Sequence, residues 1–198
     1  MRVNPLCTRR AVTALLVGLG SLLVPGQADA RGTCHPRGSE TAAQNEVGRF
    51  YTYQASYWYC AFKRRRPHQL APIEKYNYYF DTLAGRHFGF ALWVNGAFDS
   101  VQVIDMVAGK RIFRAPPAGP EPPDGGIDPE VRSLVLKRDG SIAWIATNWA
   151  EVPEVRRHDK AGSALVDSGT AIDPGSLGLG GSRIYWMRGG SARWATLR

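Results

Sequence analysis

The sequence has 198 residues, with 25 Lys and Arg against 17 Asp and Glu, and a formal net charge of +8. After the N-terminal segment, no apolar run approaches the ~20 residues of a transmembrane helix, which excludes a later membrane span. The charge favours loose attraction to anionic polymers or lipids, but it specifies no nucleic-acid partner.

The N-terminus has the pattern of an export signal. Arginines precede an apolar run at residues 11–24, and Ala28-Asp29-Ala30 provides small residues for cleavage. We therefore predict a signal peptide at residues 1–30. The adjacent Arg9 and Arg10 leave both a general secretory signal and a twin-arginine signal open. Either route would make the protein secreted or place it at the cell surface.

Residues 31–198 are expected to form a single all-β domain, because this length suits one hydrophobic core. Cys7 lies in the predicted signal peptide, so Cys34 and Cys60 remain. An even cysteine count in an oxidising compartment predicts a disulfide between them. The disulfide would close a loop of about 26 residues and contribute ~3 kcal/mol by restricting the unfolded chain.

The pattern of aromatic residues favours strands, and no long window has a helical period. Asn-Gly and Asp-Gly between apolar runs are strong hairpin signals, because their backbones adopt positive φ readily. The predicted strands, in chain order, are 47–53, 57–62, 68–73, 82–84, 87–94, 100–106, 110–114, 131–138, 141–147, 154–158, 163–166, 176–179, 183–187 and 192–197.

A repeat sets the predicted architecture. Leu83 and Trp93 are ten residues apart, as are Leu134 and Trp144, and the two pairs are offset by 51 residues. A shorter copy contains Trp186, and all three tryptophans are expected in the core. Such a period predicts blade-like four-stranded antiparallel units, as in a small or incomplete β-propeller. An N-terminal strand could complete the three-stranded last unit and close the ring; a β-sandwich is the alternative.

The segment 115–130 contains six prolines and three glycines. Proline cannot donate a hydrogen bond to a β-ladder, so an exposed loop between repeat units is predicted here.

No motif supports catalysis or a cofactor. Asp167-Ser168-Gly169-Thr170 resembles the catalytic turn of aspartic proteases, but no second such motif occurs, and a polar turn at a strand end explains it. The four histidines lack metal-binding spacing, so neither a metal nor a cofactor is expected. A hydrolase would need Asp105, Asp159 or Asp167 to meet a second acid or a histidine.

The candidate binding residues are Lys63, Arg64, Arg65 and Arg66, the one dense basic run. They could bind an anionic cell-envelope polymer, or they could form a solvated hairpin loop. Aromatic residues between Phe50 and Phe80 could stack on sugars, although cross-strand packing would explain them equally well.

Most of residues 34–198 resembles a set of small secreted bacterial β-propeller-like proteins of unassigned activity. The resemblance rests on Val166–Gly169, Ile172–Leu177, Tyr185-Trp186 and Gly189-Gly190, together with Gly140–Trp144 and the Tyr59-Cys60 strand before the arginine-rich run. It implies the fold and export, but no catalytic residue. We therefore expect a secreted, non-catalytic binding module of unidentified ligand. The partners that fit this expectation are anionic cell-envelope polymers or glycans. A secreted hydrolase acting on polysaccharide or peptide is the alternative.

Overall fold

The computed structural model describes residues 33–198, so the predicted signal peptide at residues 1–30 lies outside the described residues. Within this part there are fifteen β-strands and no helix, and hence no helix that could cross a membrane. The strands are β1 (Glu40–Gln44), β2 (Gly48–Tyr53), β3 (Ser56–Ala61), β4 (Arg66–Pro72), β5 (Tyr76–Ala84), β6 (His87–Val94), β7 (Ala97–Asp105), β8 (Lys110–Ala115), β9 (Val131–Leu136), β10 (Ile142–Thr147), β11 (Pro153–Asp159), β12 (Gly162–Ser168), β13 (Gly178–Gly180), β14 (Arg183–Arg188) and β15 (Ser191–Thr196).

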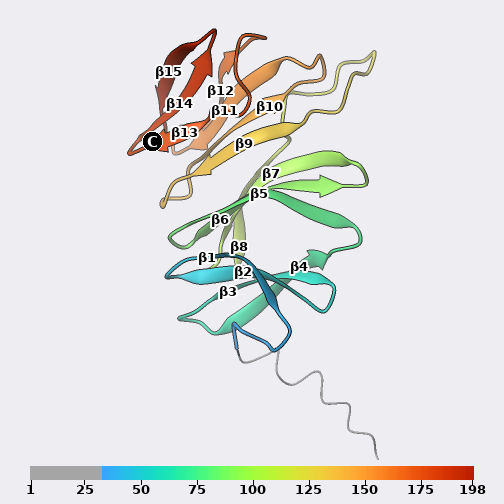
Figure 1. Cartoon of the computed structure of the whole chain (residues 1–198), viewed down its shortest axis with the longest axis vertical. Coiled ribbons are helices and arrows are strands. Elements are labelled where there is room, and N and C mark those ends of the chain that lie inside the picture. Colours follow the sequence, from blue (N-terminus) through green and yellow to red (C-terminus); the bar gives the residue numbers. More distant parts are fainter. Residues whose placement is uncertain (1–32) are drawn as a thin grey trace, which may run out of the picture.

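The strands form four antiparallel sheets in which each strand pairs with its neighbours in the sequence. Sheet I contains β1–β4, sheet II β5–β8, sheet III β9–β12 and sheet IV β13–β15. Figure 1 shows the sheets one above another along the long axis of the molecule, with sheet I at the lower end and sheet IV at the upper end. The prediction of an all-β fold made from short antiparallel units is confirmed.

A separate apolar core fills each interface between successive sheets, because alternate residues of a strand point to opposite faces. Sheets I and II enclose Phe50, Tyr59, Ala61, Phe88, Phe90, Leu92, Ile104 and Met106. Sheets II and III enclose Ala91, Val101, Val103, Phe113, Val131, Leu136, Ile142, Trp144 and Ala146. Sheets III and IV enclose Ala143, Ile145, Val155, Ile172, Ile184, Trp186 and Leu197.

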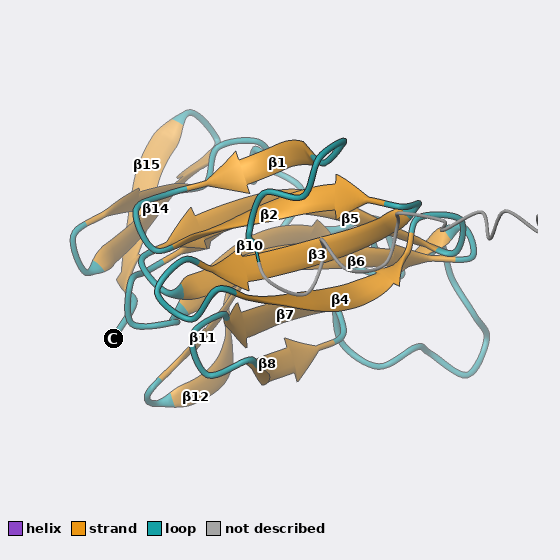
Figure 2. Cartoon of the chain, turned by 90° about the horizontal axis from the view of Figure 1, so that it is seen from below, coloured by secondary structure: helices purple, strands orange, loops and turns teal. Residues whose placement is uncertain are grey.

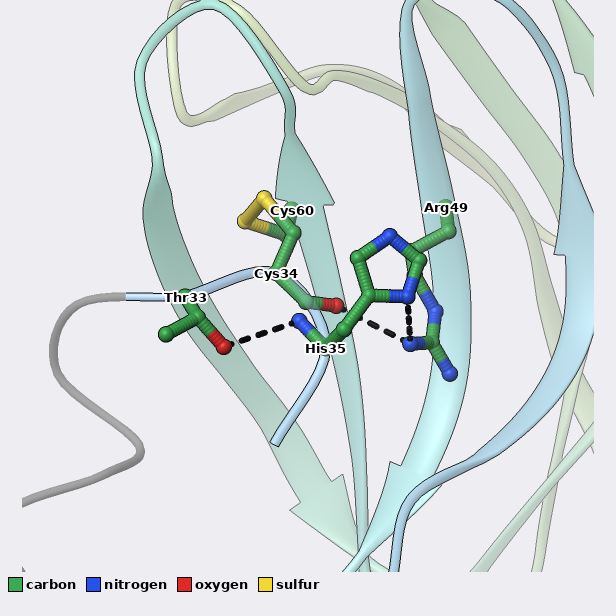
Figure 3. Close-up of a disulfide and its surroundings, with 5 residues drawn as sticks. All are labelled: Thr33, Cys34, His35, Arg49 and Cys60. Atoms are coloured by element: carbon green, nitrogen blue, oxygen red, sulfur yellow. Dashed lines mark hydrogen bonds between the residues drawn. A yellow bond between two sulfur atoms is a disulfide. The ribbon is translucent and has the colours of Figure 1, made fainter. Parts of the chain in front are cut away.

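The second face of sheet I is covered by the N-terminal segment that the disulfide fastens to it. Cys34 and Cys60 are bonded, with their Cα atoms 5.4 Å apart, as predicted. The bonded cysteines and Tyr51 form a small buried cluster on this face. Figure 3 shows how Arg49 reaches from β2 to the segment next to the disulfide. Sheet I is therefore covered on both faces.

The sheets form an open stack, and the predicted completion of the last unit by an N-terminal strand is wrong. β1 pairs with β2 in sheet I, and sheet IV contains only β13, β14 and β15 among the described residues. The contacts between sheets join β1 to β5, β5 and β6 to β9, and β9 to β13. The units are consistent with propeller-like blades or with layers of a sandwich, but residues 33–198 close no ring.

The two repeat-related tryptophans occupy different environments. Trp144 lies opposite Leu134 and is only 2% exposed, whereas Trp93 lies opposite Asn77 and is half-buried at the end of β6. The hairpin before β10 is longer than the one before β6, and a β-bulge precedes Trp93, so the strands do not keep the repeat's register. The prediction of a core position holds for Trp144 and Trp186 but is wrong for Trp93.

The proline-rich segment joins β8 to β9 and is partly tied down. Pro117 and Ala118 are buried. The indole of Trp144 donates a hydrogen bond of 2.7 Å to the Pro117 carbonyl, and that of Trp149 donates one of 2.9 Å to the Gly119 carbonyl. The predicted loop is present, but its first part is not exposed, because two indoles need acceptors that this backbone supplies.

Candidate functional site

A groove of about 710 Å³ lies between sheets I and II. β4 forms one side of the groove, and the facing surface of sheet II forms its floor. Viewed along the stack, β8 lies beyond the β4 edge of sheet I, so sheet I leaves this part of sheet II uncovered (Figure 2). The groove is therefore the uncovered continuation of the core between the two sheets.

The groove floor changes from apolar to polar across sheet II. Phe90 and Leu92 of β6 belong to the buried core and form its apolar part. On β7, Ser100 and Gln102 occupy alternate positions that lead to Ile104, so the same face becomes polar towards the end of the groove. Ser100 and Gln102 are both buried, so their polar side chains need hydrogen-bond partners within the protein.

A continuous hydrogen-bond network supplies those partners. Arg111 Nη1 donates to Gln102 Oε1 at 3.4 Å, and Gln102 Nε2 donates to Ser100 Oγ at 2.8 Å. Ser100 Oγ donates to Asp99 Oδ2 at 2.6 Å, and Arg114 Nη2 donates to both Asp99 oxygens at 3.1 and 2.8 Å. Each member orients the next, so the groove presents donors of the exposed Arg111 and Arg114 and acceptors of Asp99 and Gln102 in a fixed arrangement.

Aromatic rings of β5 and β6 contribute to the apolar part of the groove floor. Tyr78 packs edge-to-face on Tyr57 at 4.5 Å and on Phe90 at 4.8 Å between ring centroids. Burial, with smaller contributions from Tyr57 and Tyr76, raises the pKa of Tyr78 well above its usual value. Its hydroxyl therefore stays protonated at neutral pH and can donate a hydrogen bond.

His68 lies at the end of the groove where the two sheets touch. Its ring stacks on that of Tyr59, with the centroids 4.9 Å apart and the ring planes 8° from parallel. A Cβ atom at Gly109, in the β7–β8 turn, would lie 2.9 Å from His68 Cε1, so only a glycine allows this approach. Burial and the charge of Arg66 lower the pKa of His68, which favours the neutral ring at pH 7.

The basic run forms the β3–β4 turn at this end of the groove. Lys63, Arg64, Arg65 and Arg66 are exposed, and Arg65 has a positive φ of 48°. Arg66 begins β4, two residues before His68. The run thus extends a positive surface beyond the groove, in the hairpin loop that the alternative interpretation predicted.

The three aspartates considered for hydrolysis are bound to arginines and backbone amides. Asp105 pairs with Arg86 and accepts hydrogen bonds from the amides of its own turn. Asp159 accepts from Arg157 and from the Arg198 amide, and Asp167 contacts Arg188 and the indole of Trp186. The turn at Asp167 is therefore a strand end held by side-chain contacts, with no second carboxylate bonded to it among the described residues.

The histidines are engaged separately. His35 accepts a hydrogen bond from Arg49, His87 Nδ1 donates to the Arg138 carbonyl, and His158 stacks on Phe113 with centroids 4.0 Å apart. Within residues 33–198, no three His, Cys, Asp or Glu side chains cluster as metal ligands would.

Sequence reasoning missed the residues that make the groove polar, namely Gln102, Arg111 and Arg114. One signal was available: Ser100 and Gln102 alternate with Val101 and Val103 in the middle of β7. A polar pair at alternate positions indicates a strand face that is neither full core nor full surface. The partnership with β4, which makes the face a groove, was not visible in any local pattern.

No family model matches the chain, and no curated protein and no solved structure is significantly similar to it. The interpretation of the groove therefore rests on its own geometry.

Proposed function

We propose that the protein is a secreted, non-catalytic binding module whose groove binds an oligosaccharide segment of an extracellular or cell-surface polymer. The observation that supports this most is the network from Arg111 through Gln102 and Ser100 to Asp99 and Arg114, which lies in the same sheet as the groove-lining Tyr76 and Tyr78.

A sugar has hydroxyl groups at its edges and C–H groups on its faces, so it needs both kinds of surface. Arg111, Gln102 and Asp99 offer fixed donors and acceptors, while Tyr76, which lines the groove, offers a ring face. Convergent polar groups beside an apolar surface are typical of ligand sites. The basic run Lys63–Arg66 and the two groove arginines favour a ligand with anionic substituents.

Export is part of the proposal. The predicted signal peptide at residues 1–30 and the resemblance to secreted β-propeller-like proteins both favour it. The Cys34–Cys60 disulfide is compatible with an extracellular protein, because such bonds persist in oxidising compartments.

The contacts of the aspartates favour binding over hydrolysis. A general acid needs a raised pKa, which burial or a neighbouring carboxylate provides. At Asp105 and Asp159, burial alone would raise the pKa, but hydrogen bonds from arginine or backbone amides lower it below the usual value. Such carboxylates are ionised at neutral pH and cannot donate a proton to a leaving group.

The proposal is tested by calorimetric titration of the full chain with neutral and acidic oligosaccharides. Arg111→Ala and Gln102→Leu should weaken binding by ~10-fold or more, because each removes placed polar groups from the site. Arg132→Ala, which removes an exposed arginine of sheet III paired with Glu130, is the control and should bind normally. Unchanged affinity in both groove variants, or turnover of the bound sugar, would overturn the proposal.

A further inference from the structure

We propose that the outer face of sheet IV is a second binding surface, separate from the groove, and that it binds an acidic polysaccharide. This inference depends on the proposed export but not on the groove. The two ends of the stack differ in how far their outer faces are covered. The end face of sheet I is covered by the segment that carries Cys34, whereas no described residue forms a core on the end face of sheet IV.

Large aromatic side chains lie on that uncovered face. Trp194 of β15 is 55% exposed, and Tyr185 of β14, directly opposite in the register, is 39% exposed. The next residues on both strands point to the buried side, where Ile184 and Trp186 pack against sheet III. The sheet therefore places its Trp and Tyr on the side away from its own core, where they contribute little to folding.

The face is also flat and open. The ring of Tyr185 lies over Gly180 of β13, because a Cβ atom there would be 3.1 Å from Tyr185 Cε2. Gly178, the cross-strand partner of Tyr185, has nothing within 4 Å of its Cβ position. The glycines on β13 thus place no side chain beside the Tyr185 ring on that strand, which leaves room for a sugar to stack on it.

Arg183 makes the platform cationic. Its guanidinium carbon lies 4.3 Å from the centroid of the Trp194 ring. A stacked guanidinium keeps its N–H groups free at the edge, where they can bind a carboxylate in a bidentate manner. Arg183 has no carboxylate within ion-pair distance in the described part of the chain, unlike Arg188, which pairs with Asp167.

Charge indicates the occupant. Residues 174–198 contain no Asp, Glu or Lys, and of their arginines Arg183 lies on the outer face, whereas Arg188 pairs with Asp167 and Arg193 lies on the other face. Face-to-face association with a second copy would bring two Arg183 guanidinium groups together with no carboxylate on the face to pair with them, which is unfavourable. A polymer of sugar acids fits both features, because its rings can stack on Trp194 and Tyr185 while its carboxylates pair with Arg183.

The test is titration of the full chain with polygalacturonate, and with dextran as the neutral polymer. Arg183→Gln and Trp194→Ala should each weaken polygalacturonate binding by ~10-fold, since each removes a principal contact. Trp194→Phe should retain more affinity than Trp194→Ala. Arg193→Gln is the matched control, because it removes one arginine from β15, next to Trp194, at a position opposite Trp186 on the other face. It should change binding less than twofold.

Four results would overturn the inference: equal binding of dextran, unchanged affinity in Trp194→Ala, tighter binding of single-stranded DNA than of polygalacturonate, or a dimer that Trp194→Ala dissociates. The groove variant Arg111→Ala separates the two proposals. If it alone abolishes polygalacturonate binding, the polymer binds in the groove, which supports the proposed function and refutes the surface on sheet IV.

Discussion

Arg49 donates a hydrogen bond of 3.0 Å to the backbone carbonyl of Cys34, so a buried guanidinium holds the same residue that the disulfide holds (Figure 3). Arg49 is 2% exposed and also donates to His35 Nδ1 at 2.8 Å. Its guanidinium carbon lies over the ring of Tyr51, 4.3 Å from the ring centroid. No carboxylate among residues 33–198 pairs with it, and burial lowers its pKa. The N-terminal segment is thus fastened by one covalent and several polar contacts.

We expect Arg49→Ala to lower the free energy of unfolding by ~2–4 kcal/mol, because it removes charge-assisted hydrogen bonds and leaves buried acceptors unpaired. Urea denaturation measures this change. Arg132→Ala removes an exposed ion pair and should cost less than ~1 kcal/mol. Equal effects of the two substitutions would show that Arg49 does not hold the segment.

Reduction of the disulfide should lower the free energy of unfolding by about 3 kcal/mol, because the 26-residue separation sets the entropy that the bond removes from the unfolded chain. The comparison is urea denaturation with and without a reductant. In the Cys34→Ser/Cys60→Ser double variant the reductant should have no effect. A stability that is independent of reductant in the natural sequence would contradict the expectation.

Trp144→Phe should destabilise the protein by ~2–3 kcal/mol, because it leaves a cavity in the core between sheets II and III and an unpaired Pro117 carbonyl. Trp194→Phe changes an exposed ring and should cost less than ~0.5 kcal/mol. Thermal unfolding of both variants tests the difference. Similar melting temperatures would mean that the two indoles contribute equally to the fold, contrary to their burial.

Gly109→Ala should destabilise more than Gly96→Ala, by ~1 kcal/mol, because only the former also displaces a neighbour. Both glycines have positive φ, 68° and 97°, but a Cβ atom at Gly109 meets His68, whereas one at Gly96 meets nothing within 4 Å. Urea denaturation gives the two values. Adding His68→Ala to Gly109→Ala should recover part of the difference; without recovery, the contact is not the cause.

Stability should decrease as the pH falls below about 6.5, the usual pKa of histidine. Burial lowers the pKa of both His68 and His158, so the unfolded state binds protons more readily than the folded state does. Their contribution is therefore complete above the unfolded pKa and is lost as the pH falls through the folded pKa. The lowered pKa values of Asp105, Asp139 and Asp159 extend this loss to more acidic pH.

The measurement is the melting temperature between pH 4.5 and 8. The His68→Phe/His158→Phe variant should show a smaller decrease between pH 7 and 5 than the natural sequence does. An identical decrease in both proteins would exclude the two histidines as its origin.

The local pattern of the sequence was sufficient for most of the strands and their turns, but it missed β1 (Glu40–Gln44) and predicted only residues 82–84 of β5. Asn95-Gly96, Asp139-Gly140 and the aromatic runs predict hairpins, because turn geometry and side-chain alternation depend on neighbouring residues alone. Cys34 and Cys60 were the only cysteines left for pairing after the predicted signal peptide. The basic run was placed in its hairpin loop for the same reason.

The sequence alone determined an all-β chain of short hairpins with one disulfide. Only the tertiary structure decided that the sheets stack without closing a ring, that Trp144 is buried while Trp93 is not, and that Gln102, Arg111 and Arg114 line a groove with β4. The physical reason is register: hairpin length and β-bulges determine which face each side chain occupies, and the packing of one sheet on the next determines which face stays open. These depend on contacts between residues far apart in the chain, which no local pattern records.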